Sequence, residues 1–598
     1  MGQDSRQMNL RCISVVLFLL SVCVTSASAS ESPWTEVRSP HFRVLTNGGV
    51  GEARRVAYEF EQLRFVFSTR FPNARLQSGA PLLIFATRDE ETAKKLDPLT
   101  WKRMGGNMAG EFRHGWERQY AIVRLDTFGG DGAKEVVYHE YAHTILHLNS
   151  HWLPAWLDEG MAEIYGYTRF QGNKIYLGAP TLRVRTLRSR MPDPIEKIIT
   201  VDHLSPLYNG EFFYAESWAL VHFLVYGPGM EGGKKLDQFF DQLQQGVEQK
   251  KAFQQVFGDF GKLDKALASY MLQPTYATTI LTNSPQIDEK TFASRGLSVA
   301  ETEAELGAFY LWDHNGQDAR SLSLQALHDD PKLGLAYENI AFLDFIEGKD
   351  ADAAKEFAQA FALDGTLYLS LFDKTMLSPQ ATSNAVDDMN TLGATLGKVL
   401  RLNPDFAPAY VQLARLALRE NDLSSALKVA RKAEELEPSR AGYHLLSGQI
   451  ERRMGNGAVA AVSAKFVADR WFGPDHDEAV ELWNSVPAAQ RPAGESIQEM
   501  VPSDTQTVDG TVKSVTCGEP QVWAFILNHN GQPLTFHRSG GFAAGYSDTL
   551  WYGGDHFSLC HHLDGLRAVI RYHKPANTTY AGDVAEIEIR DDLPEPLK

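Results

Sequence analysis

The sequence predicts a multidomain protein with an α+β domain, an α-solenoid of helical repeats and a small C-terminal β-barrel or sandwich. The chain has 598 residues, which is more than one hydrophobic core usually organises. A 34-residue period runs through its middle, and short apolar segments separated by turns fill its last part. These three observations together predict the fold class.

The N-terminus has the charged, apolar and small-residue order of a secretory signal peptide. Arg6 and Arg11 precede an apolar run over residues 13–24, and small residues follow up to Ala29. We therefore expect a signal peptide over residues 1–29 and a mature protein that is periplasmic or secreted.

Other signals for membrane or nucleic-acid binding are weak. Leu20-Ser21-Val22-Cys23 resembles a bacterial lipoprotein box, but valine before the cysteine fits it poorly, so lipid anchoring is not expected. No later segment approaches about 18 consecutive apolar residues, so no transmembrane helix is expected in the mature chain. The formal net charge of -17 comes without a basic tract, so nucleic acid is not an expected partner.

The first domain is predicted over residues 30–280, with a sheet that backs a long helix. The expected elements are an edge strand over 34–47, a helix over 52–71, strands over 81–86 and 120–125, and a helix that opens at Asp131-Gly132. Strands followed by a long helix indicate an α+β layer.

That long helix contains the pentapeptide His139-Glu140-Tyr141-Ala142-His143. Residues four apart share one helical face at about 6 Å spacing, so the imidazoles of His139 and His143 can chelate one metal ion. Glu140 lies beside the ion without having to bind it. Two neutral nitrogen ligands and a carboxylate that can accept a proton are what a zinc hydrolase requires.

After a short turn the chain continues as LPAWLDEGMAEIYGY over residues 153–167. Together with the pentapeptide, this segment resembles the gluzincin metallopeptidases, most closely their peptidase MA-like branch. The resemblance implies Zn²⁺ on His139, His143 and Glu159, with Glu140 as the general base that acts on a metal-activated water. It also implies that Glu163 orients a ligand histidine; a solvated helix carboxylate is the equal alternative.

The helix over residues 213–224 resembles the gluzincin helix that follows the metal site. The resemblance implies that Tyr214 is catalytic and donates to the developing oxyanion, while a tyrosine that anchors the helix is the alternative. For His147 and His151 we expect rim or packed positions. The basic run from Arg183 to Arg190 can bind a substrate carboxylate, although a solvated face is the favoured interpretation.

The 34-residue period lies within residues 297–485, after an expected linker over 281–296. Ala319, Ala353, Ala426 and Ala460 stand 34, 73 and 34 residues apart. A small residue at a fixed helix crossing resembles the tetratricopeptide repeat, here in four units with an irregular stretch over about 365–403. The resemblance implies a protein partner that binds the repeats.

A second linker is predicted over residues 486–509, before a β-rich domain over 510–598 with an OB-like barrel as one option. Cys12 and Cys23 leave with the signal peptide, so Cys517 and Cys560 are expected to form a disulfide. A metal site made by Cys560 with its neighbouring histidines is the rival interpretation.

These patterns predict an exported zinc-dependent peptidase that acts on a peptide or protein substrate. The alternative is an exported tetratricopeptide scaffold or binding protein whose peptidase-like domain is inactive or binds metal structurally. A third possibility, oligosaccharide binding by the β domain, rests on fold analogy alone.

Overall fold

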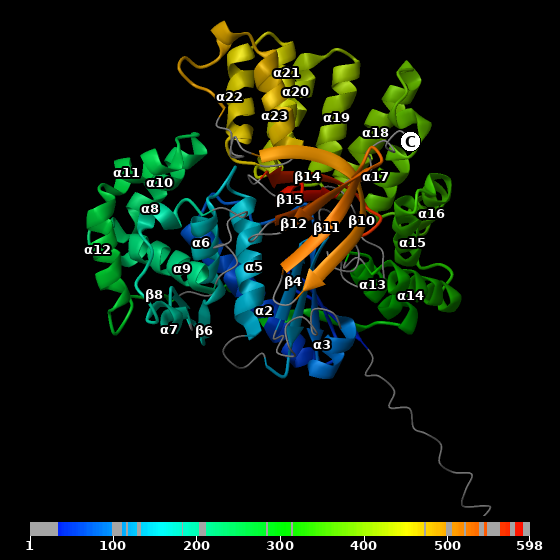
Figure 1. Cartoon of the computed structure of the whole chain (residues 1–598). Helices are drawn as coiled ribbons and strands as arrows, with labels where there is room; N and C mark the ends of the chain where they lie inside the picture. The colour runs from blue at the N-terminus through cyan, green and yellow to red at the C-terminus, as the bar shows by residue number, and fades with distance from the viewer. Residues whose placement is uncertain are drawn as a thin grey trace, which may run out of the picture.

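The computed structural model describes residues 34–97, 110–114, 118–127, 133–181, 183–201, 211–282, 285–312, 315–471, 474–497, 505–518, 522–537, 543–546, 563–574 and 580–589. The described residues form an α+β domain, an arc of helix pairs and a small β-barrel (Figure 1). The signal-peptide prediction over residues 1–29 lies outside the described residues and stays a prediction.

The main sheet of the first domain has the strand order β4-β5-β3-β2-β1-β9. Its strands are β1 (Thr35–Arg38), β2 (Arg43–Thr46), β3 (Leu82–Thr87), β4 (Gly110–His114), β5 (Gln119–Arg124) and β9 (Ala293–Gly296). β3 pairs in parallel with β2 and β5, and the other pairings are antiparallel.

Two parts of this sheet differ from the expectation. The edge strand predicted over 34–47 is a hairpin, because the chain turns where Ser39 N donates to Phe42 O at 3.0 Å. The linker predicted over 281–296 ends in β9, which pairs with β1 and forms one edge of the main sheet. All four residues of β9 are exposed, so backbone pairing rather than an apolar pattern makes this strand.

One face of the sheet packs against α2 (Val50–Arg70) and α5 (Ala133–His147). Helix α6 (Ala155–Gly166) packs on α5, and α9 (Glu211–Tyr226) packs on α6. The remaining helices of the domain are α3 (Glu90–Leu96), α7 (Arg183–Leu187), α8 (Ile195–Ile198), α10 (Lys234–Gln244), α11 (Gln249–Phe257) and α12 (Phe260–Met271), with η1 (Glu231–Gly233) before α10. A small sheet of β6 (Arg169–Gln171), β7 (Lys174–Leu177) and β8 (Thr279–Leu281) completes it.

The repeats are antiparallel helix pairs that curve along the right side and the top of Figure 1. The helices are α13 (Val299–Trp312), α14 (Gly316–Asp329), α15 (Gly334–Ile346), α16 (Asp350–Leu363), α17 (Tyr368–Met376), α18 (Val386–Leu402), α19 (Ala407–Arg419), α20 (Leu423–Leu436), α21 (Ala441–Arg453), α22 (Gly457–Ala468) and α23 (Pro474–Ser485). The four periodic alanines lie in α14, α16, α20 and α22, and each is fully buried. The predicted α-solenoid is therefore confirmed.

The stretch expected to be irregular is a further helix pair. α17 and α18 occupy it, and the short helix η3 (Pro379–Ala381) lengthens their connection. The longer connection breaks the 34-residue spacing, which is why the period did not reveal this pair.

The first repeat helix, α13, packs against the main sheet. The ring of Phe309 on α13 lies 5.4 Å from that of Phe85 on β3 and 5.5 Å from that of Tyr120 on β5. Further along the array, Arg118 forms an ion pair with Glu338 on α15, and Glu338 is fully buried. The repeats therefore share a core with the first domain.

The C-terminal strands close a five-stranded barrel. Its strands are β10 (Thr505–Gly518), β11 (Val522–His529), β12 (Gln532–His537), β14 (Arg567–His573) and β15 (Gly582–Ile589), with β13 (Ala543–Tyr546) added to β15. A parallel pairing between β12 and β15 closes the ring, which confirms a barrel over a sandwich. β10 begins at Thr505, inside the linker predicted over 486–509.

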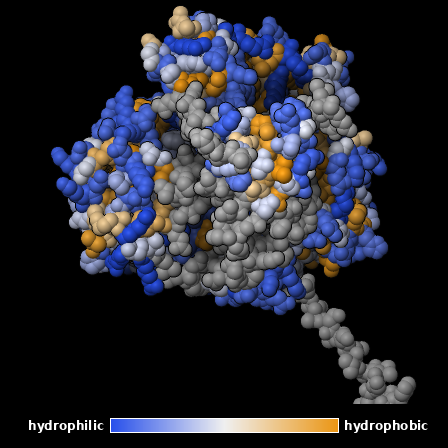
Figure 2. All heavy atoms as spheres, in the orientation of Figure 1, coloured by the Kyte–Doolittle hydropathy of each residue, from blue (hydrophilic) through white to orange (hydrophobic). Residues whose placement is uncertain are grey.

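The surface over α10, α11 and the repeat helices α14 to α16 is predominantly hydrophilic in Figure 2, with apolar residues scattered between. Within the described ranges, no helix combines the length and apolar character that crossing a bilayer requires.

Candidate metal centre

Helix α5 presents its histidines on the face opposite to the one that anchors it. The ring of Tyr141 is buried between α5 and the layer beneath, with centroids 5.7 Å from Phe42 and 5.8 Å from Phe60 in edge contacts. Because residues three or four apart share a helical face, this anchoring turns the face of His139 and His143 toward α6.

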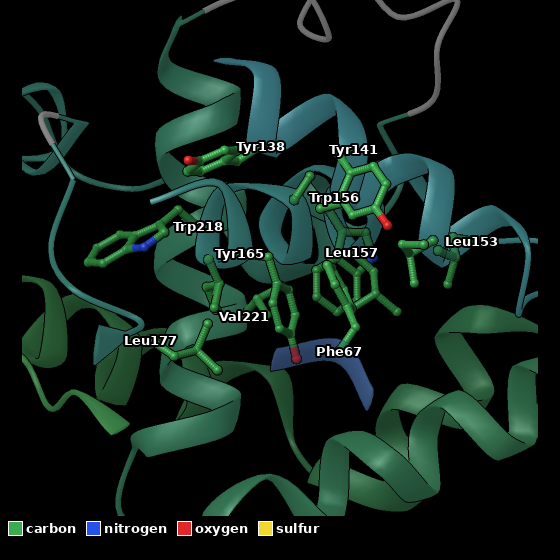
Figure 3. Packing of buried hydrophobic residues seen from close by; sticks show 14 of the residues in the cluster. Phe67, Tyr138, Tyr141, Leu153, Trp156, Leu157, Tyr165, Leu177, Trp218 and Val221 are labelled. Carbon is green, nitrogen blue, oxygen red and sulfur yellow. The ribbon is translucent and has the colours of Figure 1, made fainter. Parts of the chain in front are cut away.

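Helix α6 is held rigidly because nearly its whole length is buried (Figure 3). Trp156 is fully buried and donates from Nε1 to Gln249 Oε1 at 2.8 Å. Gly160 lies so close to α9 that a Cβ there would collide with the carbonyl oxygen of Ser217. Both features fix the position of Glu159, which lies between Trp156 and Gly160 in sequence.

A second glycine sets the crossing of α6 with α5. A Cβ on Gly166 would lie 2.9 Å from His139 Cβ and 3.0 Å from Glu135 O. The close approach of the two helices therefore requires glycine at this position, and it brings the carboxylates of α6 within reach of the histidines of α5.

Three predicted ligand atoms converge between these helices. His139 Nε2 and His143 Nε2 are 3.1 Å apart, and Glu159 Oε2 is 3.2 Å from the first and 3.5 Å from the second. Ligand atoms about 2.0–2.1 Å from a tetrahedral zinc ion lie about 3.3 Å from one another. The residues present therefore fit a zinc ion.

The charges of these groups favour a cation. Burial raises the pKa of Glu159, but hydrogen bonds and charge from His139 and His143 outweigh it and lower the pKa to about 2. Burial lowers the pKa of His143, yet the Asp158 and Glu159 carboxylates raise it well above its usual range. This raised pKa favours a proton on the imidazole of His143 when no metal is bound, and a cation at the three atoms would take the place of that proton.

A carboxylate lies near the Nδ1 atom of each of the two predicted ligand histidines. His143 Nδ1 donates to Asp158 Oδ1 at 2.8 Å, which leaves the Nε2 lone pair for a metal. His139 Nδ1 lies 3.8 Å from Glu163 Oε1, and Arg183 Nε donates to that oxygen at 2.7 Å. Glu163 is buried, which excludes the alternative that it is a solvated helix carboxylate.

Glu140 and Tyr214 border the same site. Glu140 is half-buried on the ligand-bearing helix, and Tyr214 is half-buried on α9. Burial and the negative charges of Glu159, Glu140 and Glu163 raise the pKa of the Tyr214 hydroxyl well above its usual range. This hydroxyl therefore keeps its proton at neutral pH and remains a hydrogen-bond donor.

Sequence reasoning missed two supporting residues. Asp158 directly precedes the expected ligand Glu159, and its position in WLDEG was the available signal. Arg183 was assigned to a substrate-binding or solvated basic face, but it bonds Glu163 and its guanidinium carbon lies 4.9 Å from the Tyr214 ring centroid. No local pattern could reveal this, because the contacts join separate elements.

Other predicted residues lie elsewhere. Arg190 stacks on Phe212, with its guanidinium carbon 3.6 Å from the ring centroid. His151 packs against His444 of the repeats at 5.2 Å between ring centroids, in line with the packed position expected for it.

The disulfide prediction is not addressed by the described residues. Cys560 and the histidines around it lie outside them, and of Cys517 only the backbone in β10 is described. The Cys517–Cys560 bond therefore stays a prediction.

Comparisons with known proteins concern the repeats. No protein-family model matches the chain. The chain is 37% identical over 109 residues to the tetratricopeptide repeat and J domain-containing co-chaperone DNJ1 of Fusarium oxysporum f. sp. lycopersici, a match that covers 16% of this chain and 20% of that protein. The chain thus spans about a fifth of the curated relative that it matches.

Two solved structures are similar at low identity. PilF of Pseudomonas aeruginosa is 16% identical, covers 31% of this chain and 88% of its own, and has a TM-score of 0.26. A thermophilic tetratricopeptide protein of Thermus thermophilus is 15% identical, covers 31% of this chain and 98% of its own, and has a TM-score of 0.25. The successive antiparallel helix pairs of this chain form a tetratricopeptide-like helical array.

Proposed function

We propose that this chain is an exported zinc-dependent peptidase of the gluzincin type, whose repeats recruit a protein substrate or partner. The observation that carries the proposal is the convergence of His139 Nε2, His143 Nε2 and Glu159 Oε2, with Glu140 on the same helix. Export rests on the N-terminal sequence alone.

The donor set favours zinc among common metals. Two imidazoles and one carboxylate match catalytic zinc sites, whereas calcium and magnesium prefer oxygen ligands. Bound zinc would supply Lewis acidity and lower the pKa of a water molecule toward about 7.

The chain's own residues supply the proton transfers. The Glu140 carboxylate accepts a proton from the attacking water and passes it to the leaving amine. The Tyr214 hydroxyl, which keeps its proton, donates a hydrogen bond to the developing oxyanion. A purely structural metal site would gain nothing from a base such as Glu140 beside the ion.

A second function is favoured by the comparisons. The curated relative, to which the chain is 37% identical over 109 residues, is a tetratricopeptide repeat co-chaperone. In this alternative the chain is an exported tetratricopeptide scaffold or binding protein, and its first domain is inactive or binds zinc structurally.

The test compares the mature chain, residues 30–598, with its Glu140→Gln and His143→Ala variants. We expect about one zinc per wild-type chain and cleavage of casein or a peptide library. Glu140→Gln should keep its zinc and lose about 10²- to 10⁴-fold in rate, the usual contribution of a general base. His143→Ala should lose zinc.

Three results would contradict the proposal. Cleavage that survives Glu140→Gln would remove the mechanism, and full zinc in His143→Ala would remove the ligand set. A zinc-loaded wild type that cleaves nothing in a diverse library, yet captures a protein through its repeats, would favour the scaffold.

A further inference from the structure

The carboxylate of Asp158 is held between two histidines of α5. Its Oδ1 accepts from His143 Nδ1 at 2.8 Å, and its Oδ2 lies 2.8 Å from His147 Nε2. The Asp158 side chain is 9% exposed, whereas that of His147 is 46% exposed. A surface histidine thus reaches a buried carboxylate that supports a predicted metal ligand.

Both oxygens of this carboxylate are occupied, and this restricts its rotation. With one hydrogen bond a carboxylate can turn about its terminal torsion, which is broad for aspartate. With an imidazole on each oxygen, the plane of the carboxylate is set by two points on α5 that are one helical turn apart. The ring of His143 is then held with Nε2 toward His139, 3.1 Å away.

We propose that His147 is a positioning residue of the metal centre: through Asp158 it fixes the orientation of His143. The inference rests on the proposed zinc site, because its consequence is the affinity and geometry of that site. The sequence assigned His147 only to the rim or to packing, since eight residues separate it from His139 and prevent both from binding one ion.

An ion pair between two exposed side chains would not influence a metal ligand in this way. Exposed ion pairs contribute about 0–1 kcal/mol and tolerate loss of a partner. Here the partner Asp158 is buried and its other oxygen holds a predicted ligand. Loss of His147 therefore releases a carboxylate that orients the metal site rather than a solvated group.

The test uses His147→Ala and His147→Gln in the mature chain, because a glutamine amide can still donate to Asp158. His328→Ala is the matched control, since His328 is also exposed in the last turn of a helix, α14. The readouts are the zinc dissociation constant by chelator competition, the visible spectrum of the cobalt(II)-substituted protein, the melting temperature of the metal-free protein, and kcat and KM.

We expect His147→Ala to weaken zinc binding about 10-fold, the lower end for outer-shell partners of a metal site. It should also shift the cobalt absorption bands and lower kcat more than it changes KM. His147→Gln should recover most of the affinity and the spectrum, and His328→Ala should match wild type.

Wild-type zinc affinity and cobalt bands in His147→Ala would overturn the inference. Equal losses of zinc affinity in both His147 variants, with matching drops in the melting temperature of the metal-free protein, would also overturn it. That pattern would indicate a structural role for His147. A second zinc equivalent that depends on His147 would also overturn it, since His143, His147 and Asp158 would then form a metal site of their own. If zinc affinity depends on His147 but wild type cleaves no peptide, the proposed function fails and the inference stands.

Discussion

Arg183 Nε donates to Glu163 Oε1 at 2.7 Å and so joins α7 to the carboxylate behind His139. Burial raises the pKa of Glu163, and the positive charge of Arg183 only partly offsets this. The same guanidinium stacks on Tyr214. The guanidinium of Arg183 therefore contacts both Glu163 and Tyr214, the predicted oxyanion donor.

Loss of that cation should weaken the metal centre. We expect Arg183→Gln to reduce zinc affinity and cleavage about 10-fold, because Glu163 becomes protonated and its electrostatic attraction to His139, 3.8 Å away, weakens. Glu163→Gln should have a similar effect, and the double variant should lose little more, since the two residues act together. Arg185→Gln, exposed on the same helix, is the control; additive losses would contradict the coupling.

Gly160 should be intolerant of any side chain. Gly160→Ala forces α6 away from the Ser217 carbonyl of α9, and overpacking of this kind costs about 1–3 kcal/mol. We expect a lower melting temperature together with weaker zinc binding, because Glu159 adjoins this position. Gly51→Ala in α2, where a Cβ meets nothing within 4 Å, should be neutral or stabilising. Unchanged zinc affinity in Gly160→Ala would show that the α6–α9 contact does not position Glu159.

The main sheet of the first domain should lose stability in acid through Glu36 on β1. Burial raises the pKa of Glu36, but hydrogen bonds and charge from Arg43 and Arg38 outweigh it and lower the pKa from 4.5 to about 2. A lowered folded-state pKa stabilises the fold above the unfolded pKa, so this contribution is complete above about pH 4.5 and is lost as the pH falls toward 2.

The expected loss of stability in acid is modest because water screens the interaction between Glu36 and Arg38. At about 1.4 kcal/mol per pKa unit, the lowered pKa of Glu36 corresponds to about 3 kcal/mol of stability. Because Arg38 is exposed, we expect the measured contribution to be about 1–2 kcal/mol. Denaturant melts from pH 7 to pH 3 should show this loss in wild type and a smaller pH dependence in Glu36→Gln. Parallel curves for the two proteins would rule the contribution out.

The repeats and the first domain should unfold together. Phe309 of α13 is fully buried against Phe85 and Tyr120, and truncation of a buried phenylalanine costs about 3–5 kcal/mol. We expect Phe309→Ala to lower the stability of both units, measured by calorimetry and by hydrogen exchange in β3 and α15. Leu324→Ala, at a 54% exposed position, is the control. Destabilisation confined to the repeats would show that α13 is not part of the sheet's core.

The exported form should contain one disulfide and begin at Ser30. Mass spectrometry of the mature protein should find this N-terminus, and a thiol assay on denatured, unreduced protein should find about zero free thiols. A count near two would exclude the bond between Cys517 and Cys560, and retention of residues 1–29 would exclude the signal peptide. An extracellular compartment is the condition under which such a bond persists.

Local spacing made the main features predictable. His139 and His143 are four residues apart on one helix, and Glu159 lies in a second helix whose apolar residues mark it plainly. The buried alanines of the repeats recur at a fixed helix crossing. The sequence did not reveal β9, whose residues are all exposed, or the pair α17 and α18, whose long connection interrupts the period.

The sequence by itself determined which residues are candidate metal ligands, that the middle of the chain is a helical solenoid, and that its end is a β domain. Helical and strand periodicities are local, so short segments suffice to read them. Only the tertiary structure decided that Asp158 lies between His143 and His147, that Arg183 supports Glu163, and that Phe309 closes the sheet. These contacts depend on how closely helices cross, which Gly160 and Gly166 set through packing between elements far apart in the chain.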